Sequence, residues 1–262
     1  MSLYLPIPQQ PDCISAWREA VRMVEAQPSH CAYNVVLDIA DPTRNTTLQD
    51  PGVALVDDFL RQQGQQAVGT VANTIFPASL YHRYGAPAFF DVFQERVLRR
   101  VRRNERWSGY YFERMIDVSV PEGKSPNQLW DIVGRINDKK VKSLNKFELP
   151  LFDAARDVDN SPYGGQCLSF LSFKVVPGAK NSGKKLGLTA MYRNHFYVEK
   201  LLGNLIGLGR LMDFVCRETG LDLGELTIVS TRAEVDLPKG TRRNDIKTLL
   251  SRVRDAGQKY AA

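Results

Sequence analysis

Cys167 and Arg193 are two residues whose types and positions suit covalent chemistry. Cys167 begins a segment of alternating apolar residues, and residues 186–193 alternate again after a turn rich in glycine and lysine. Alternation with a period of two predicts two strands, and the turn predicts an antiparallel hairpin. The hairpin would place Cys167 and Arg193 at the same open end. Because a nearby cation lowers the pKa of a thiol and raises its thiolate fraction, the pair predicts a reactive cysteine.

The helix expected over residues 196–219 follows this hairpin directly and carries Asn204. Its residues are apolar almost all round, which predicts a helix buried on most sides. A buried amide needs hydrogen-bond partners. Asn204 therefore bonds either to the protein backbone or to a bound ligand, and we favour the ligand.

A second polar site is expected in the loop after the strand at 33–39. The loop contains Arg44, Asn45, Thr46 and Thr47. A guanidinium, an amide and hydroxyls suit a phosphate, which arginine binds with two parallel hydrogen bonds. The alternative is a turn with a solvent-exposed arginine.

These features together resemble the thymidylate synthase family, which includes the pyrimidine nucleotide hydroxymethylases. The resemblance covers about residues 107–236 and rests on Cys167, on Tyr-Arg-Asn at 192–194, on the helix with Asn204 and on the turn at 218–226. It implies that Cys167 is the catalytic nucleophile. It also implies that Arg193, Asn194 and Arg44 bind a phosphate and that Asn204 binds the pyrimidine edge.

The same resemblance implies further roles. Family members carry a catalytic glutamate on a helix that corresponds to residues 86–104, and Glu95 is the candidate there. In the family, paired arginines reach the phosphate of the partner subunit, and Lys139 and Lys140 stand near that position. Glu234 takes the place of a sugar-binding histidine. The cleft candidates are Tyr111, Glu113 and Arg114.

The chain departs from the family pattern at several positions. Leu168 replaces the histidine after the nucleophile, Phe112 replaces a glycine, and no aspartate follows Arg193 closely. A basic helix at 237–262 stands where the family has further strands and a tail that closes over folate. These differences affect folate closure and reductive methyl transfer more than nucleotide binding, and they favour hydroxymethyl over methyl transfer.

Composition limits the ligand and the compartment. The chain has 262 residues, 43% of them hydrophobic and 24% charged, with a net charge of +6 that suits an anionic ligand. No apolar run reaches the roughly 20 residues of a membrane helix, and the N-terminus shows no signal peptide. The four cysteines and three histidines show no metal-ligand spacing. We expect a cytoplasmic protein with free thiols and no metal.

We expect one α/β (α+β) domain, a large mixed sheet covered by helices, over residues 1–236 plus the C-terminal helix. Residues 67–77 are predicted to be a strand or extended loop. The expected function is transfer of a one-carbon unit from 5,10-methylenetetrahydrofolate to C5 of a pyrimidine nucleoside monophosphate in a homodimer. The alternative is a non-catalytic nucleotide-binding or scaffold protein. Nucleic-acid binding through residues 96–106 and the last helix rests on charge alone and is not favoured.

Overall fold

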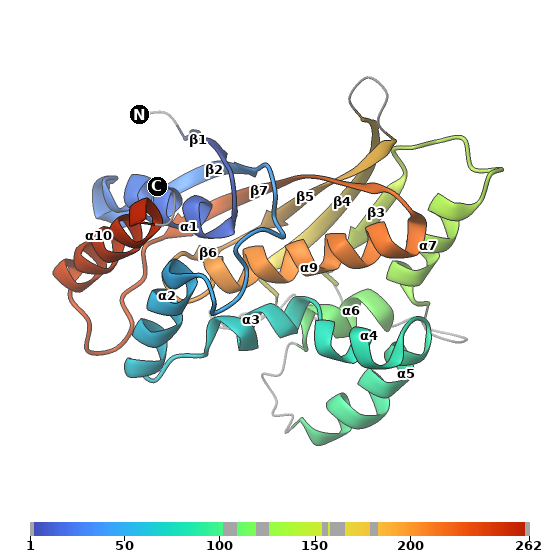
Figure 1. Ribbon diagram of the computed structural model, residues 1–262, viewed down its shortest axis with the longest axis horizontal. Coiled ribbons are helices and arrows are strands. Elements are labelled where there is room, and N and C mark those ends of the chain that lie inside the picture. Colours follow the sequence, from blue (N-terminus) through green and yellow to red (C-terminus); the bar gives the residue numbers. More distant parts are fainter. Residues whose placement is uncertain are drawn as a thin grey trace.

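A mixed sheet forms the frame of the protein, and helices pack against one of its faces (Figure 1). The computed structural model describes residues 3–101, 109–118, 126–153, 157, 166–178 and 183–259, and the sheet has seven strands within them. The predicted α/β fold with one large mixed sheet is confirmed. None of the described helices is long and apolar enough to cross a bilayer.

The strand order across the sheet is β1-β2-β7-β5-β4-β3, and the short β6 also pairs with β7. The pairs β1/β2, β5/β7 and β6/β7 are parallel, and the other neighbours are antiparallel. The strands are β1 (Leu5–Gln10), β2 (Cys31–Ile39), β3 (Phe147–Pro150), β4 (Leu168–Pro177), β5 (Lys184–Tyr192), β6 (His195–Phe196) and β7 (Asp222–Glu234).

The hairpin of β4 and β5 follows the prediction. Leu168 pairs with Tyr192, and the backbone N–H of Arg193 donates to the carbonyl of Cys167 at 2.9 Å. Leu186, Leu188, Ala190 and Tyr192 all point into the core, as their alternation predicts. Cys167 and Arg193 therefore lie side by side at the open end of the hairpin.

Helices α1 and α2 each begin after an aspartate, a residue type that favours the N-cap position. Asp12 caps α1 by accepting from the backbone N–H of Ser15 at 2.9 Å, and Asp50 caps α2 in the same way with Val53. The described helices are α1 (Cys13–Glu25), α2 (Pro51–Gln62), α3 (Val68–Ile75), α4 (Ala78–Tyr84), α5 (Ala88–Val92), α6 (Tyr111–Ile116), α7 (Gln128–Asn137), α9 (Leu201–Thr219) and α10 (Arg243–Lys259). The chain after α5 continues as a π-turn (Phe93–Val97) and a 3₁₀ turn (Leu98–Arg100).

The prediction of a strand or extended loop over residues 67–77 is wrong, because α3 occupies this segment. Its β-branched residues favour strands, but its buried positions recur at spacings of three and four and pack along α9. Gly203 of α9 permits the contact: a Cβ there would lie 2.5 Å from the Cβ of Val71. Tertiary packing against a glycine groove thus overrides local preference.

One helix boundary and one strand also differ from the prediction. The long buried helix was expected from residue 196, but His195–Phe196 form β6 beside β7, and α9 begins at Leu201. Strand β1 was not predicted, since it contains Pro6 and Pro8. It is an edge strand, where proline is tolerated because one side of the strand makes no ladder hydrogen bonds.

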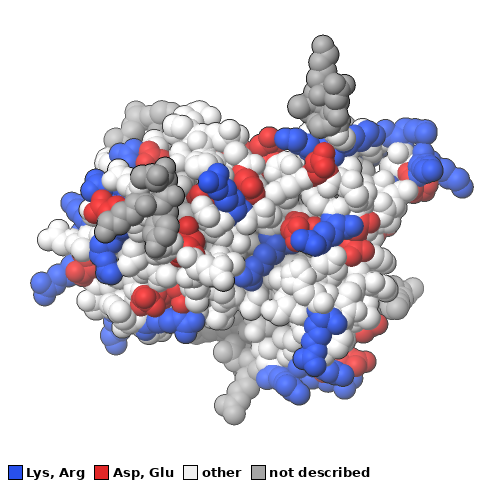
Figure 2. All heavy atoms as spheres, in the orientation of Figure 1, with Lys and Arg blue, Asp and Glu red and all other residues white. Residues whose placement is uncertain are grey.

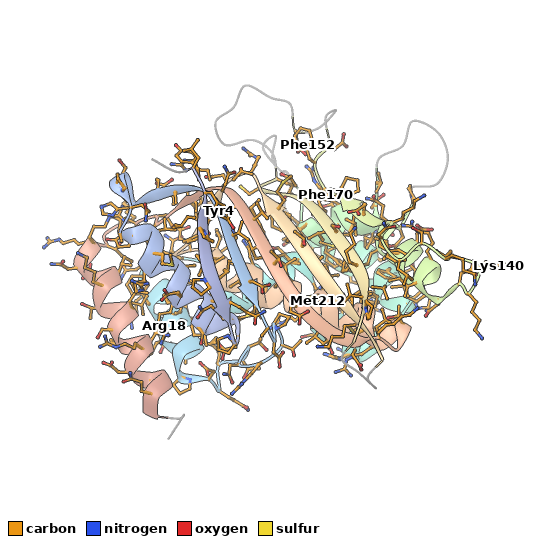
Figure 3. All side chains as sticks on the ribbon, turned by 90° about the horizontal axis from the view of Figure 1, so that it is seen from above. Tyr4, Arg18, Lys140, Phe152, Phe170 and Met212 are labelled. Carbon is orange, nitrogen blue, oxygen red and sulfur yellow. The ribbon has the colours of Figure 1, made fainter. Side chains whose placement is uncertain are left out.

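The face of the sheet opposite the helices carries a row of apolar side chains. Residues paired across neighbouring strands lie on the same face, and this row crosses six strands. Figure 3 looks onto this face, with Phe170 labelled. The row, which is exposed or half-buried throughout, consists of Pro6, Val36, Val229, Met191, Phe170 and Pro150.

Candidate functional site

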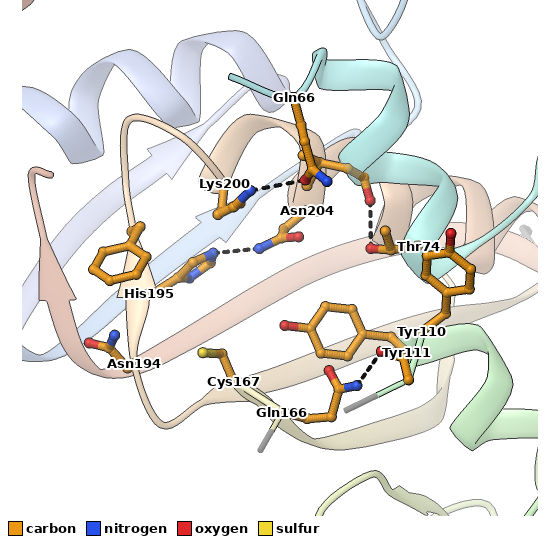
Figure 4. Close-up of a pocket in the computed structure, with 13 residues that line it drawn as sticks. Gln66, Thr74, Tyr110, Tyr111, Gln166, Cys167, Asn194, His195, Lys200 and Asn204 are labelled. Carbon is orange, nitrogen blue, oxygen red and sulfur yellow. Dashed lines mark hydrogen bonds between the residues drawn. The ribbon is translucent and has the colours of Figure 1, made fainter. Parts of the chain in front are cut away.

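A cavity of about 340 Å³ lies where the open end of the hairpin meets the start of α9 (Figure 4). Elements distant in the sequence build it, and together they supply a thiol, amides, phenols and one ammonium. The walls are Gln66, Val71 and Thr74 at α3, residues 109–111 at α6, Gln166, Cys167 and Asn194 at the hairpin end, and His195, Phe196, Lys200 and Asn204 around β6 and α9.

Cys167 lies half-buried in this cavity, immediately before β4. Burial raises the pKa of its thiol, while the charges of Arg193 and Lys200 lower it. Because burial is the largest of these effects, the pKa is raised overall, and the prediction of a lowered pKa is wrong in sign. Arg193 acts in the expected direction but does not decide the outcome.

Asn204 lines the cavity from the first turn of α9 and is 3% exposed. Its Nδ2 lies 2.9 Å from Nε2 of His195, whose Nδ1 lies 3.1 Å from Oγ of Ser230. Burial lowers the pKa of His195 to about 3, so its ring is neutral at physiological pH. The amide is therefore held by a buried side-chain network rather than by the backbone. One end of the Asn204 side chain is fixed, and the rest faces the cavity.

Two tyrosines surround the thiol. The hydroxyl of Tyr111 accepts from the backbone N–H of Leu168 at 3.4 Å, next to Cys167. The ring of Tyr192 stacks on that of His195 with 3.9 Å between centroids, and its buried hydroxyl has no hydrogen-bond partner within the described residues. Burial raises the pKa of both phenols, so they are neutral donors. Tyr111 lines the same cavity as Cys167.

Lys200 was not among the residues singled out from the sequence. Its Nζ donates to Oε1 of Gln66 at 3.0 Å (Figure 4). None of the described residues that line the cavity is an aspartate or a glutamate, and Lys200 is the one lysine or arginine among them. A sequence signal did exist: Lys200 precedes Asn204 by four residues at the start of an apolar helix, a spacing that places both on one helix face.

Arg193 lies beside the cavity. Its Nε donates to the carbonyl of Gln166 at 3.0 Å, and its own carbonyl accepts from the hydroxyl of Thr231 at 2.8 Å. The next residue, Asn194, lines the cavity, and its Oδ1 accepts from Arg232 at 2.9 Å. This edge of the cavity is therefore positively charged and well ordered by hydrogen bonds.

Several predicted site residues lie elsewhere. Arg44 is exposed in a loop that packs through Pro42 against Gly209 of α9, and Glu95 is exposed on the π-turn after α5. Glu234 pairs with Arg232 at 2.7 Å, beside Asn194 but not in the wall of the cavity. Lys139 and Lys140 are exposed in the turn after α7. None of these five residues is brought to Cys167 by the fold of this chain.

Glu113 and Arg114 are structural, which corrects their assignment to the cleft. Glu113 is buried and caps α6 by accepting from the backbone N–H of Tyr110 at 3.3 Å. Arg114 is buried too; its Nη2 donates to Asp157 at 2.7 Å and its Nη1 to the carbonyl of Leu151 at 2.9 Å. Phe112, between Tyr111 and these two, belongs to the aromatic core.

A second cavity, of about 350 Å³, adjoins the first and shares Gln66, Thr74 and Tyr110 with it. Its walls combine apolar rings and chains, including Phe93, with neutral hydrogen-bonding groups such as Asn73. The two cavities together offer room for two ligands side by side.

Within the described parts of the chain, no three His, Cys, Asp or Glu side chains are grouped so that they could hold a metal ion. No protein-family model matches this chain, and no curated protein sequence matches it. The chemistry of the cavity is therefore the basis on which its function is assigned.

Proposed function

We propose that the cavity binds a pyrimidine nucleoside monophosphate and that Cys167 adds to C6 of its ring, which prepares C5 for transfer of a hydroxymethyl or methyl group. The observation that carries this proposal is that a half-buried thiol and a buried asparagine amide line one cavity, with an arginine at its edge. The resemblance to the thymidylate synthase family assigns these residue types to the nucleophile, the base contact and the phosphate contact.

The size and polarity of the cavity suit this ligand. Small-molecule sites typically enclose roughly 300–1,000 Å³, and the cavity of about 340 Å³ is at the lower end of that range. The free part of the Asn204 amide would bind the polar edge of the base. Arg193 and Asn194 would face the phosphate, since arginine binds phosphate through charge-assisted hydrogen bonds.

The thiol of Cys167 would carry out the covalent step. Cys167 loses its proton to solvent, and the sulfur forms a bond to C6 while the C5–C6 electron pair moves toward C5 and O4. This makes C5 a nucleophile that bonds to the one-carbon unit. The C5 proton is then lost to solvent, and its electron pair restores the C5–C6 double bond as the Cys167 thiolate leaves. The raised pKa means that only a small part of the thiol is ionised at neutral pH, so the adjacent cations of Arg193 and Lys200 matter for the rate.

The second cavity fits the one-carbon donor, 5,10-methylenetetrahydrofolate. A pterin is flat and carries several donors and acceptors, which suits walls that combine Phe93 and Tyr110 with Gln66, Asn73 and Thr70. When bound, this donor would supply the one-carbon unit. The chain itself would hold the pterin beside the pyrimidine and keep water away from the wall that the two cavities share.

We further propose that the protein is a homodimer joined through the open face of the sheet. Contiguous exposed apolar patches often mark interaction surfaces, and the residues of the apolar row from Pro6 to Pro150 are exposed or half-buried. A second copy related by a twofold axis would bury the same row on both subunits.

One set of observations favours the non-catalytic alternative. The pKa of Cys167 is raised, and the described lining residues include no carboxylate that could act as a base. A nucleotide sensor would need the pocket but not the covalent step. Binding to nucleic acid has less support, because blue and red side chains are interspersed on the described part of the face in Figure 2.

Release of tritium from nucleotides labelled at C5 separates these possibilities, because exchange requires covalent addition at C6. We expect release from one of dUMP, dCMP, UMP or CMP, and none from the same nucleotide with Cys167→Ala. Binding of a nucleotide without any exchange would favour the sensor. Full exchange by Cys167→Ala would exclude the covalent mechanism.

A further inference from the structure

Lys200 places a positive charge inside the cavity, next to the residue that would bind the base. It is the last residue before α9, four positions ahead of Asn204, and both line the cavity. In Figure 4 the two side chains project from the same part of the chain, across the cavity from Cys167. The polar contact of its Nζ is with Gln66 Oε1, a neutral acceptor.

The protein does not neutralise this charge within the described residues. No ion pair joins Lys200 to an acidic side chain among them, and the described cavity wall contains no aspartate or glutamate. Asp236, which follows β7 and lies near the start of α9, accepts instead from the backbone N–H groups of Val198 and Glu199. The N-terminus of α9 adds positive potential at the same place, because peptide dipoles align along a helix.

A cation that faces a cavity without an acidic partner is available to a ligand or an intermediate that carries negative charge. The proposed reaction supplies one, because addition of a thiolate to a neutral ring moves the negative charge from sulfur to C5 and O4. The proposed function assigns the phosphate to Arg193 and Asn194, so the phosphate does not account for Lys200.

We propose, on the basis of the function proposed above, that Lys200 is a catalytic residue that stabilises the enolate formed on O4 of a uracil nucleotide when Cys167 adds to C6. As the S–C6 bond forms, the C5–C6 π pair forms a C4–C5 double bond, the C4–O4 π pair moves onto O4, and an N–H of the Lys200 ammonium donates a hydrogen bond to that oxygen. When the thiolate is eliminated, the electron pair returns and the ammonium keeps its proton.

The other polar groups of the cavity are less suited to this role. His195 is neutral, with a pKa lowered to about 3, and its Nε2 faces Asn204. Asn204 is a neutral amide, and its nitrogen is engaged with His195. Preorganised donors aimed at developing charge are often the largest single contribution to catalysis.

A structural role for Lys200 is the competing explanation, because its bond to Gln66 links the start of α9 to the segment before α3. The test must therefore distinguish removal of the charge from removal of the link. Lys200→Met removes both, Lys200→Arg keeps the charge, and Gln66→Ala removes the link while it keeps the charge of Lys200. Lys247→Met, on the exposed face of α10, is the matched control for loss of one lysine charge.

Each variant is assayed for nucleotide binding by calorimetry and for tritium release from the C5-labelled nucleotide that the wild type exchanges. For Lys200→Met we expect a dissociation constant within about threefold of wild type and an exchange rate lowered by about 100-fold, the usual effect of removing one such donor. Lys200→Arg should recover part of the rate, Gln66→Ala should lower it by a much smaller factor, and Lys247→Met should match wild type.

Exchange by Lys200→Met within threefold of wild type would overturn the catalytic role while leaving the proposed function intact. An equal loss in Gln66→Ala would also overturn it, in favour of the structural link. Absence of exchange in the wild type with every nucleotide would refute the proposed function itself, and with it the role of Lys200.

Discussion

The contact between α3 and α9 gives the sharpest prediction about how the fold supports the cavity. Gly203 of α9 faces α3, and a Cβ there would lie 2.5 Å from Val71 Cβ and 2.9 Å from the carbonyl of Val68. Both of these atoms are fixed by the backbone, so neither can rotate away. Gly203→Ala must therefore push α3 aside, and α3 carries Val71 and Thr74 of the cavity wall.

Two opposing contributions determine how Gly203→Ala changes the free energy of unfolding. Overpacking a tight core typically costs about 1–3 kcal/mol, while replacing glycine by alanine inside a helix contributes about 0.8–1 kcal/mol in favour of folding. Gly134→Ala in α7 measures the gain from replacing a helical glycine by itself, because a Cβ at that position would have no packing contact within 4 Å among the described residues. The difference in stability between the two variants is then the packing term, about 1–3 kcal/mol.

Thermal and urea unfolding of the two variants measure this difference. For a chain of this size, 1 kcal/mol corresponds to about 2–4 °C in Tm, so Gly203→Ala should melt roughly 2–12 °C below Gly134→Ala. Gly203→Ala should also bind nucleotide more weakly, because the shift of α3 reaches the cavity. If Gly203→Ala melts as high as Gly134→Ala, the close contact of α3 with α9 is refuted.

Three further predictions concern the buried network, the open sheet face and the edge of the cavity. His195 has a pKa lowered to about 3, so between pH 3 and 6.5 the unfolded chain binds the proton that the folded chain does not. Acidification in that window should therefore destabilise the fold by up to about 1.4 kcal/mol per pH unit. Asp236, with its pKa raised to about 6, acts oppositely between pH 3.8 and 6. The measurement is accordingly the difference in pH slope between wild type and His195→Phe, and equal slopes would contradict the buried neutral histidine. Met191→Asp, in the middle of the apolar row, should convert the dimer to a monomer by light scattering, whereas a wild type that is already monomeric would refute the dimer. Arg193→Gln should raise the dissociation constant for a nucleoside monophosphate more than tenfold and leave that for the unphosphorylated nucleoside unchanged; equal losses for both would exclude a phosphate contact.

The parts of the fold that local pattern determines were predictable from the sequence. The β4/β5 hairpin follows from alternation and a turn, and the register that places Cys167 beside Arg193 follows from the hairpin. The burial of Asn204 follows from the apolar helix around it. The start of α1 follows from Asp12, whose side chain caps the first turn.

The parts of the structure that depend on packing between distant segments were not predictable from the sequence. Helix α3 differs from the extended segment predicted from its β-branched residues, because it packs closely against Gly203 and Gly207 of α9. The positions of Arg44 and Glu95 depend on how distant loops pack, which no local spacing encodes. The sign of the pKa shift of Cys167 was missed because burial of the thiol is a tertiary property.

Lys200 shows a different limit. A lysine at the start of a buried helix usually snorkels to solvent, and its four-residue spacing from Asn204 became meaningful only with the cavity in view. Gln66 likewise comes from a segment with no functional pattern of its own. A site assembled from four separate segments is apparent in the structure before it is apparent in the sequence.

The central claim is that Cys167 forms a covalent bond to a pyrimidine nucleotide, and peptide mass spectrometry tests it most directly. The protein is incubated with 5-fluoro-dUMP, 5-fluoro-dCMP and their ribose counterparts, with and without methylenetetrahydrofolate, then denatured and digested. Cys13, Cys31 and Cys216 serve as internal controls, since they lie outside the cavity. We predict one nucleotide adduct, on the peptide that contains Cys167. Unmodified Cys167 with every nucleotide, or an adduct on another cysteine, would contradict the account.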